Sequence, residues 1–245
     1  MVAMMDRRNC QLYTSIVALR DDAQAANLSR FFKTGPGQYG EGDIFLGVKV
    51  PQTREVVKRL WRSCSFADLE ECIRSEYHEV RLAALLVLVQ VFRHAKKDPA
   101  MQQRCVDFYL SYTLYINNWD LVDLSCYEIL GAWLLDKADR HLLYELAAEG
   151  HSLWEQRIAM VSCMAFVRQG QFDDCLAIAD RLMGHPHDLI HKAVGWLLRE
   201  VGKHDSQALE DYLAPRYRSM PRTTLRYAIE RFSPEVRKDY LKGSI

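Results

Sequence analysis

A repeated helical pattern is the feature that most constrains how this chain can fold. Four segments each place a basic residue just before a small or apolar stretch. They are VRLAAL from Val80, QRIAMV from Gln156, HKAVGW from His191 and LRYAIE from Leu225. The basic positions 81, 157, 192 and 226 are separated by 76, 35 and 34 residues, and 76 is twice 38. This period predicts stacked repeats that contribute two helices each.

Helix-start signals recur after about residue 50. Proline suits the first helical turn, and serine or aspartate before it suits the cap. The signals are Pro51, Asp98 with Pro99, a capping box from Ser152 to Glu155, and Ser233 with Pro234. Almost no strand pattern accompanies them. The predicted fold is therefore all-α, a HEAT-like α-solenoid of stacked helical pairs with a concave groove.

The chain length of 245 residues allows one elongated domain or two compact ones. We predict one HEAT-like repeat domain over residues 1–245. Within it we expect an N-terminal helical segment at 1–28, a glycine-containing loop at 29–50 and tandem helical repeats over 51–245.

Neither a membrane span nor a secretory signal is visible in the sequence. The longest apolar run, from Leu82 to Val89, is too short to cross a bilayer. The N-terminal residues MVAMMDRRNC lead into a segment that lacks the apolar stretch and cleavage site of a signal peptide. We therefore expect a cytoplasmic protein with no membrane partner. The seven cysteines are scattered without a CxxC pair, so we expect buried free thiols rather than disulfides or metal ligands.

Charge is distributed unevenly although the net charge is zero. Residues 29–62 hold seven basic against three acidic side chains and residues 181–245 hold twelve against eight, whereas residues 63–180 hold ten against eighteen. In stacked helical pairs, equivalent positions line one groove. The basic track Arg81, Arg157, Lys192 and Arg226 therefore suits a phosphate backbone. The alternative is that these residues are solvated helix charges or inter-repeat salt bridges.

The missing member of the series falls near residue 120, within NNWDLVDLS at 117–125, where Asp120 replaces the basic residue. Trp119 and Asp123 are four residues apart and so share one helix face, while Asp120 points about a hundred degrees away. An aromatic plane beside a carboxylate can hold a sugar or base and stabilise positive charge. The alternative is that both acids favour the positive end of a helix capped by Asn117 or Asn118, with the tryptophan in the core.

Two further tryptophans lie beside basic members of the series. Trp154 precedes Arg157 by three residues, and Trp196 follows Lys192 by four. Several tryptophans at basic positions of one groove indicate an aromatic and cationic cradle for nucleic acid.

At these segments the sequence resembles the AlkD-type DNA alkylation repair glycosylases, which are HEAT-like repeat proteins. The resemblance rests on NNWDLVDLS, SLWEQRIAMV, HKAVGWLLREVGK, FFKTGPGQYGEGDIFLGVKVP and RYAIERF, and it runs in order from about residue 30 to residue 241. It implies a protein that binds duplex DNA in its groove and releases cationic N3- and N7-alkylated purines. It places the family's catalytic pair on Trp119 and Asp123, its groove arginine on Arg157 and its second groove tryptophan on Trp196.

The chemistry agrees with this set of residues. An alkylated purine is already cationic and leaves as a neutral base, so the sugar left behind develops positive charge. A carboxylate beside that sugar stabilises the charge and orients the attacking water. We assign this role to Asp123, contacts to deoxyribose to Trp119 and Trp196, and a phosphate contact to Arg157. We expect a monomer that needs no cofactor. A noncatalytic nucleic-acid-binding solenoid and a protein-interaction scaffold are the alternatives.

Two further motifs are weaker. GPGQYG from Gly35 matches GxGxxG, but no strand precedes it, so a turn-rich loop is the better interpretation than a dinucleotide site. His185, His187 and His191 lie close together without a clear fourth ligand, so we expect an inter-helix turn and no metal site.

Overall fold

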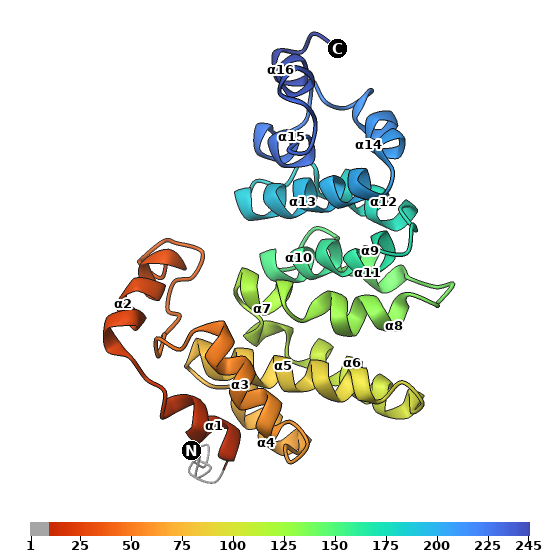
Figure 1. Ribbon diagram of the computed structural model, residues 1–245. Coiled ribbons are helices and arrows are strands. Elements are labelled where there is room, and N and C mark those ends of the chain that lie inside the picture. Colours follow the sequence, from red (N-terminus) through yellow and green to blue (C-terminus); the bar gives the residue numbers. More distant parts are fainter. Residues whose placement is uncertain (1–9) are drawn as a thin grey trace. The chain divides into compact units, whose positions relative to one another are not determined.

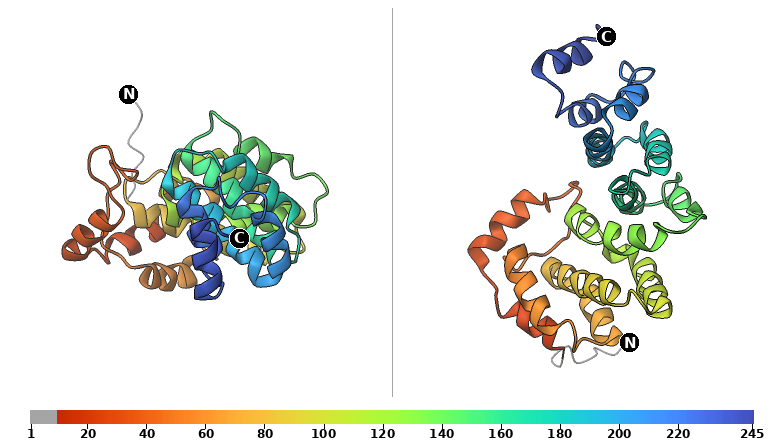
Figure 2. Two further views of the ribbon diagram at one scale, coloured as in Figure 1. Left: turned by 90° about the horizontal axis from the view of Figure 1, so that it is seen from above. Right: turned by 45° about the vertical axis from the view of Figure 1, so that its right-hand side comes forward.

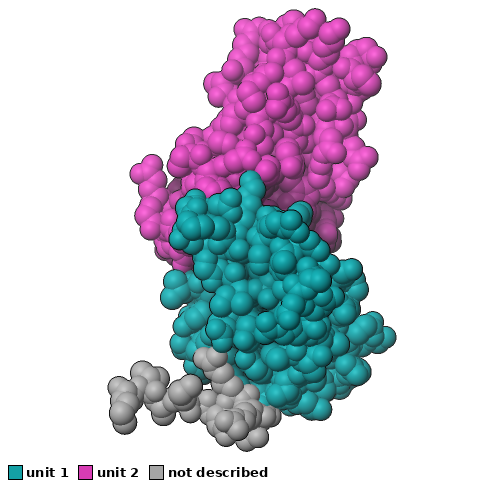
Figure 3. Space-filling view, turned by 90° about the vertical axis from the view of Figure 1, so that its left-hand side faces the viewer, with its two compact units in different colours: residues 1–125 teal, residues 126–245 magenta. Residues whose placement is uncertain are grey.

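The computed structural model of the protein describes residues 10–245 and divides them between two compact units. Unit 1 is Met1–Ser125 and unit 2 is Cys126–Ile245, shown in teal and magenta in Figure 3. Residues 1–9, which begin the predicted N-terminal segment, lie outside the described residues. The single repeat domain stays a prediction.

The described residues form helices joined by loops, with one isolated β-bridge between Ile44 and Tyr77. This architecture confirms the predicted all-α fold class and is consistent with an α-solenoid. Among the described helices, none combines the length and apolar character that crossing a bilayer requires. The seven cysteines are free thiols, and all but the half-buried Cys64 are buried.

Unit 1 is organised around one long buried helix. Its helices are α1 (Gln11–Val17), α2 (Asp22–Phe31), α3 (Val50–Leu60), α4 (Phe66–Ile73), α5 (His78–His94), α6 (Pro99–Ser111) and α7 (Trp119–Asp123), with a 3₁₀ turn at Thr113–Tyr115. Helix α5 packs against α1, α3, α4, α6 and α7 (Figure 1). Its sequence is apolar almost all round, which is the pattern of a helix enclosed by others.

The loop between α2 and α3 is anchored to the first turn of α5. The buried carboxylate of Glu79 accepts hydrogen bonds from the backbone N–H groups of Leu46 and Gly47 at 2.8 Å and of Val48 at 3.1 Å. Gly47 has a φ of 89°, and a Cβ there would lie 2.1 Å from the carbonyl oxygen of Asp21. The loop therefore lies tightly against α5 and the start of α2, as a folded connection rich in turns.

Unit 2 is organised around α13. Its helices are α8 (Ala132–Leu134), α9 (His141–Leu146), α10 (Leu153–Ser162), α11 (Met164–Val167), α12 (Asp173–Leu182), α13 (Asp188–His204), α14 (Ser206–Leu213), α15 (Arg222–Ala228) and α16 (Pro234–Lys242), after a π-helical turn at Tyr127–Gly131. Helix α10 packs against α13, and α13 packs against α15, so these three form a row (Figure 2).

The predicted repeat period is confirmed within unit 2. Helices α10, α13 and α15 begin at residues 153, 188 and 222, and Arg157, Lys192 and Arg226 are each the fifth residue of their helix. The capping box of Ser152 and Glu155 is present, and Asp98 and Ser233 cap α6 and α16 as predicted.

The repeat breaks in unit 1. Helix α5 begins at residue 78 and α7 at residue 119, so the spacing there is 41 residues. The extra residues include the 3₁₀ turn before α7. Asp120 is consequently the second residue of its helix, and it does not occupy the position of the basic residues in unit 2.

Candidate functional site

Helix α7 carries the Trp119 and Asp123 pair on five residues. The Asn118 side chain caps the helix, and its Oδ1 accepts a hydrogen bond from the Trp119 backbone N–H at 2.9 Å. Trp119 and Asp123 are both partly exposed, whereas Asp120 is 5% exposed. The two acidic residues of this short helix therefore differ in environment: Asp123 is partly exposed and Asp120 is buried.

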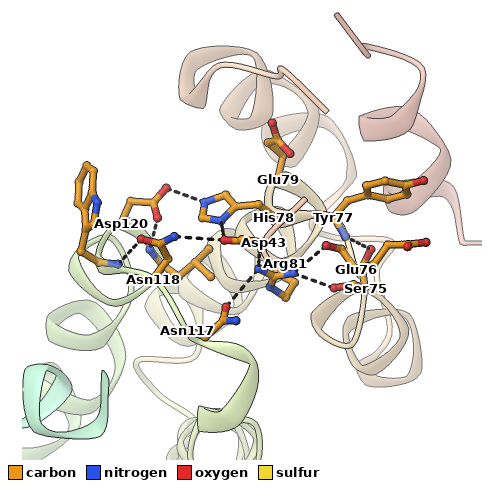
Figure 4. Close-up of polar contacts among 12 residues, drawn as sticks. Asp43, Ser75, Glu76, Tyr77, His78, Glu79, Arg81, Asn117, Asn118 and Asp120 are labelled. Atoms are coloured by element: carbon orange, nitrogen blue, oxygen red, sulfur yellow. Dashed lines mark hydrogen bonds and ion pairs between the residues drawn. The ribbon is translucent and has the colours of Figure 1, made fainter. Parts of the chain in front are cut away.

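The enclosed carboxylate of Asp120 belongs to a buried chain of charged groups (Figure 4). Asp120 Oδ2 lies 2.9 Å from Nε2 of His78, and Nδ1 of the same imidazole lies 2.8 Å from Oδ2 of Asp43. The Asn118 amide donates a further hydrogen bond to Asp43 at 3.1 Å. These hydrogen bonds join the α2–α3 loop, α5 and the start of α7.

Arg81 completes this network from the next turn of α5. Its guanidinium donates to Asp43 at 2.5 Å, to Asn117 Oδ1 at 3.2 Å and to the Ser75 carbonyl at 2.9 Å. The residue is 4% exposed. The terminal nitrogens of the Arg81 guanidinium are thus engaged by contacts inside unit 1.

The charges of the network compensate one another. Burial opposes the charged form of Asp43, but His78 and Arg81 outweigh it and lower the pKa of Asp43 to about 2. Burial also opposes the charged form of His78 and would by itself lower its pKa. Asp120 and Asp43 outweigh this effect and raise the pKa of His78 to about 9. The imidazole is therefore protonated at neutral pH, and each ring nitrogen donates to a carboxylate.

An aromatic stack runs from Trp119 to the same imidazole. The Trp119 ring stacks on Phe32 with centroids 5.1 Å apart. Phe32 stacks on Phe45 at 4.9 Å, and Phe45 stacks on His78 at 4.4 Å. Phe31, which is 63% exposed, meets the edge of Trp119 at 6.0 Å. The indole thus rests on a packed aromatic column and keeps part of its surface open.

The comparisons with known proteins agree with this fold and these motifs. The family model described as DNA alkylation repair enzyme matches residues 13–232. The chain belongs to the DNA alkylation repair enzyme family. A solved structure described as a predicted DNA alkylation repair enzyme from Enterococcus faecalis is similar, with a TM-score of 0.67 and 17% identity, covering 88% of this chain and 97% of that one. A search of curated proteins gave no significant match.

The other candidate residues of this family member lie in unit 2. Arg157 is 5% exposed, and its guanidinium donates to the Leu189 carbonyl of α13 at 2.5 Å. Lys192 forms an ion pair with Asp188 one turn earlier at 2.8 Å, and Arg226 is exposed on α15. Trp154 and Trp196 are partly exposed. The structure therefore keeps Arg226 open to solvent and gives Arg157 a contact between successive helices.

The histidine cluster has a local structural role. His187 caps α13, because its Nδ1 accepts from the Leu189 backbone N–H at 3.1 Å, and His185 accepts from the His187 backbone N–H at 3.0 Å. Among residues 10–245, no group of three or more histidine, cysteine or acidic side chains is arranged to hold a metal ion.

Sequence reasoning missed the residues that support α7. Asp43, His78 and Phe32 each lie 42 residues or more before Asp120 along the chain. No local spacing connects them, because the loop that carries Asp43 folds back onto α5. The sequence carried no signal for this contact, because the 5% exposure of Asp120 appears only in the folded chain.

Proposed function

We propose that the protein is a DNA glycosylase that hydrolyses the N-glycosidic bond of cationic N3- and N7-alkylated purines in duplex DNA. Membership of the DNA alkylation repair enzyme family supports a role in alkylation repair. The observation that supports glycosylase activity in particular is the different environment of the two acidic residues on α7. Asp120 is buried with its carboxylate 2.9 Å from His78, whereas Asp123 and Trp119 are partly exposed one turn apart.

The proposed reaction needs one carboxylate. As the C1′–N bond breaks, the bonding electron pair leaves with the cationic purine, which becomes a neutral base. Positive charge then develops on the sugar, where the Asp123 carboxylate stabilises it. Water forms the new C1′–O bond, and its proton passes to Asp123 and then to solvent. Trp119 supplies a flat surface against the deoxyribose of the damaged nucleotide.

Residues of unit 2 are proposed to contact the DNA backbone and sugar. Arg226 and Lys192 are suited to phosphates because both are accessible, and we expect Arg226 to contribute most because it is exposed. Arg157 is proposed to contribute less, since part of its guanidinium is engaged with Leu189. Trp154 and Trp196 supply aromatic surface. Arg81 is left out of this set because its guanidinium is paired with the buried carboxylate of Asp43.

The test is release of free base from alkylated DNA. Duplex DNA treated with a methylating agent is incubated with wild-type protein and with Asp123→Asn, and free 7-methylguanine and 3-methyladenine are separated by chromatography. We expect release by the wild type and a loss of about 10²- to 10³-fold in the variant, the range for removing one electrostatic contact to a transition state. Binding of the variant to undamaged duplex DNA should be unchanged.

Two results would contradict the proposal. Undiminished release by Asp123→Asn would remove that residue from the reaction. Salt-dependent binding to duplex DNA without any base release by the wild type would favour the noncatalytic DNA-binding alternative. DNA incubated without protein is the control for spontaneous depurination.

A further inference from the structure

We propose that His78 is the positioning residue of the α7 site, holding Trp119 and Asp123 in place by bridging the carboxylates of Asp43 and Asp120. This inference rests on the proposed glycosylase function. It assigns no contact with DNA to His78, which is 1% exposed.

The need for a bridge follows from the length of α7. A helix of five residues cannot hold its own position, because isolated helices this short are not stable in water. Its location therefore depends on what its first turn contacts. Among the described residues of unit 1, its polar contacts include the Asp120 bond to His78 at 2.9 Å and the Asn118 bond to Asp43 at 3.1 Å, while its apolar residues Leu121 and Val122 are buried.

Only a protonated imidazole satisfies both sides of this bridge. Each ring nitrogen faces a carboxylate oxygen, at 2.8 Å and 2.9 Å, and a neutral ring has a single N–H to donate. Asp43, Asp120, His78 and Arg81 together carry two negative and two positive charges. Loss of the His78 proton would leave an uncompensated negative charge in a buried site and a lone pair pointing at a carboxylate.

The same ring also supports the indole of Trp119. The charged groups that face the imidazole are Asp43 from the α2–α3 loop and Asp120 from α7, with Arg81 of α5 itself on the far side of Asp43. The other close neighbours are the apolar rings of Phe45 at 4.4 Å and Phe32 at 5.2 Å. A cation against these rings adds a favourable contact. His78 thus contacts α7 directly through Asp120, and it supports Trp119 through the stacked rings of Phe45 and Phe32.

A consequence is an alkaline limit on activity. The pKa of His78 is raised to about 9 by the two carboxylates, so the bridge is intact at neutral pH and weakens as pH rises through that value. Misplacing a reacting group by about 1 Å can cost on the order of 100-fold in rate. The rate of base release should therefore fall above about pH 9 while DNA binding persists.

The experiment compares single-turnover base release by wild type, His78→Gln and His94→Gln between pH 6 and pH 10. His94 lies at the exposed end of the same helix and is the matched control. We expect His78→Gln to lose about 10- to 100-fold in rate at pH 7 with unchanged affinity for duplex DNA, and to lack the alkaline fall of the wild type. His94→Gln should match the wild type throughout.

Two outcomes overturn the assignment. One is a His78→Gln variant with the rate and pH profile of the wild type. The other is a slower variant that keeps the alkaline fall, since that result describes a purely structural loss. If the wild type releases no base at any pH, the proposed function fails instead.

A second measurement stays decisive if His78→Gln does not fold. Nitrogen NMR of ¹⁵N-histidine-labelled wild-type protein should show the His78 ring protonated on both nitrogens at pH 7.5 and titrating near pH 9. A ring with a single proton at pH 7.5 overturns the bridge.

Discussion

The two units hold their helices in place by different means. In unit 2, helices α10, α13 and α15 begin 35 and 34 residues apart and meet through apolar and backbone contacts. Gly195 allows α13 and α15 to approach closely, because a Cβ there would lie 2.5 Å from Cβ of Tyr227 and 2.6 Å from the Thr224 carbonyl oxygen. In unit 1, α7 is short, begins 41 residues after α5, and adds buried charged contacts to the burial of Leu121 and Val122.

The difference shows where a repeat protein can place a reactive group. A regular repeat protein buries apolar surface continuously, and its polar residues occupy equivalent positions from one repeat to the next. Where the repeat breaks, a short helix can be held by side chains from distant segments. Such a site depends on a few strong contacts, so single substitutions there should have larger effects than those at matching positions in unit 2.

The largest expected effect on stability comes from breaking the buried network. Arg81→Leu leaves Asp43 without its ion pair, and removing one partner of a buried pair costs about 3–5 kcal/mol. Arg226 belongs to the same series of basic residues but is exposed in unit 2. Arg226→Leu should therefore change the free energy of unfolding by less than about 0.5 kcal/mol. Urea unfolding of both variants measures this contrast, and equal effects would contradict it.

A somewhat smaller effect on the free energy of unfolding should come from a rise in pH. The folded-state pKa of His78 is about 9 against an ordinary value of 6.5, so its stabilising contribution is complete below pH 6.5 and is lost as pH rises to about 9. The loss is on the order of 3 kcal/mol. Unfolding free energies at pH 6 and pH 9 should differ more for the wild type than for His78→Gln. Identical pH dependence in the two proteins would remove this contribution from His78.

The smallest of these effects tests the packing of unit 2. Gly195→Ala adds a methyl group where α13 and α15 touch, and overpacking of this kind costs about 1–3 kcal/mol. Gly184→Ala is the matched control, since a Cβ there meets nothing within 4 Å. In thermal unfolding, Gly195→Ala should have a lower melting temperature than Gly184→Ala. A neutral Gly195→Ala would mean that the helices separate without cost.

The sequence predicted the regular parts of this molecule well and the site only in part. The period of α10, α13 and α15 was visible because each repeat places Arg157, Lys192 and Arg226 at the same position. The pairing of Trp119 with Asp123 on one helix was visible from their spacing. The partner of Asp120 was not, because His78 and Asp43 meet it through a long-range fold of the chain that no local pattern encodes.

The two carboxylates of α7 are proposed to have separate roles, Asp123 in the reaction and Asp120 in holding the helix. The most direct test is the single-turnover rate of base release by Asp123→Asn, taken together with its free energy of unfolding. We predict a rate about 10²- to 10³-fold below the wild type in a protein that still unfolds in a cooperative transition, because asparagine keeps the size of the side chain. A variant that releases 7-methylguanine at the wild-type rate would contradict the account.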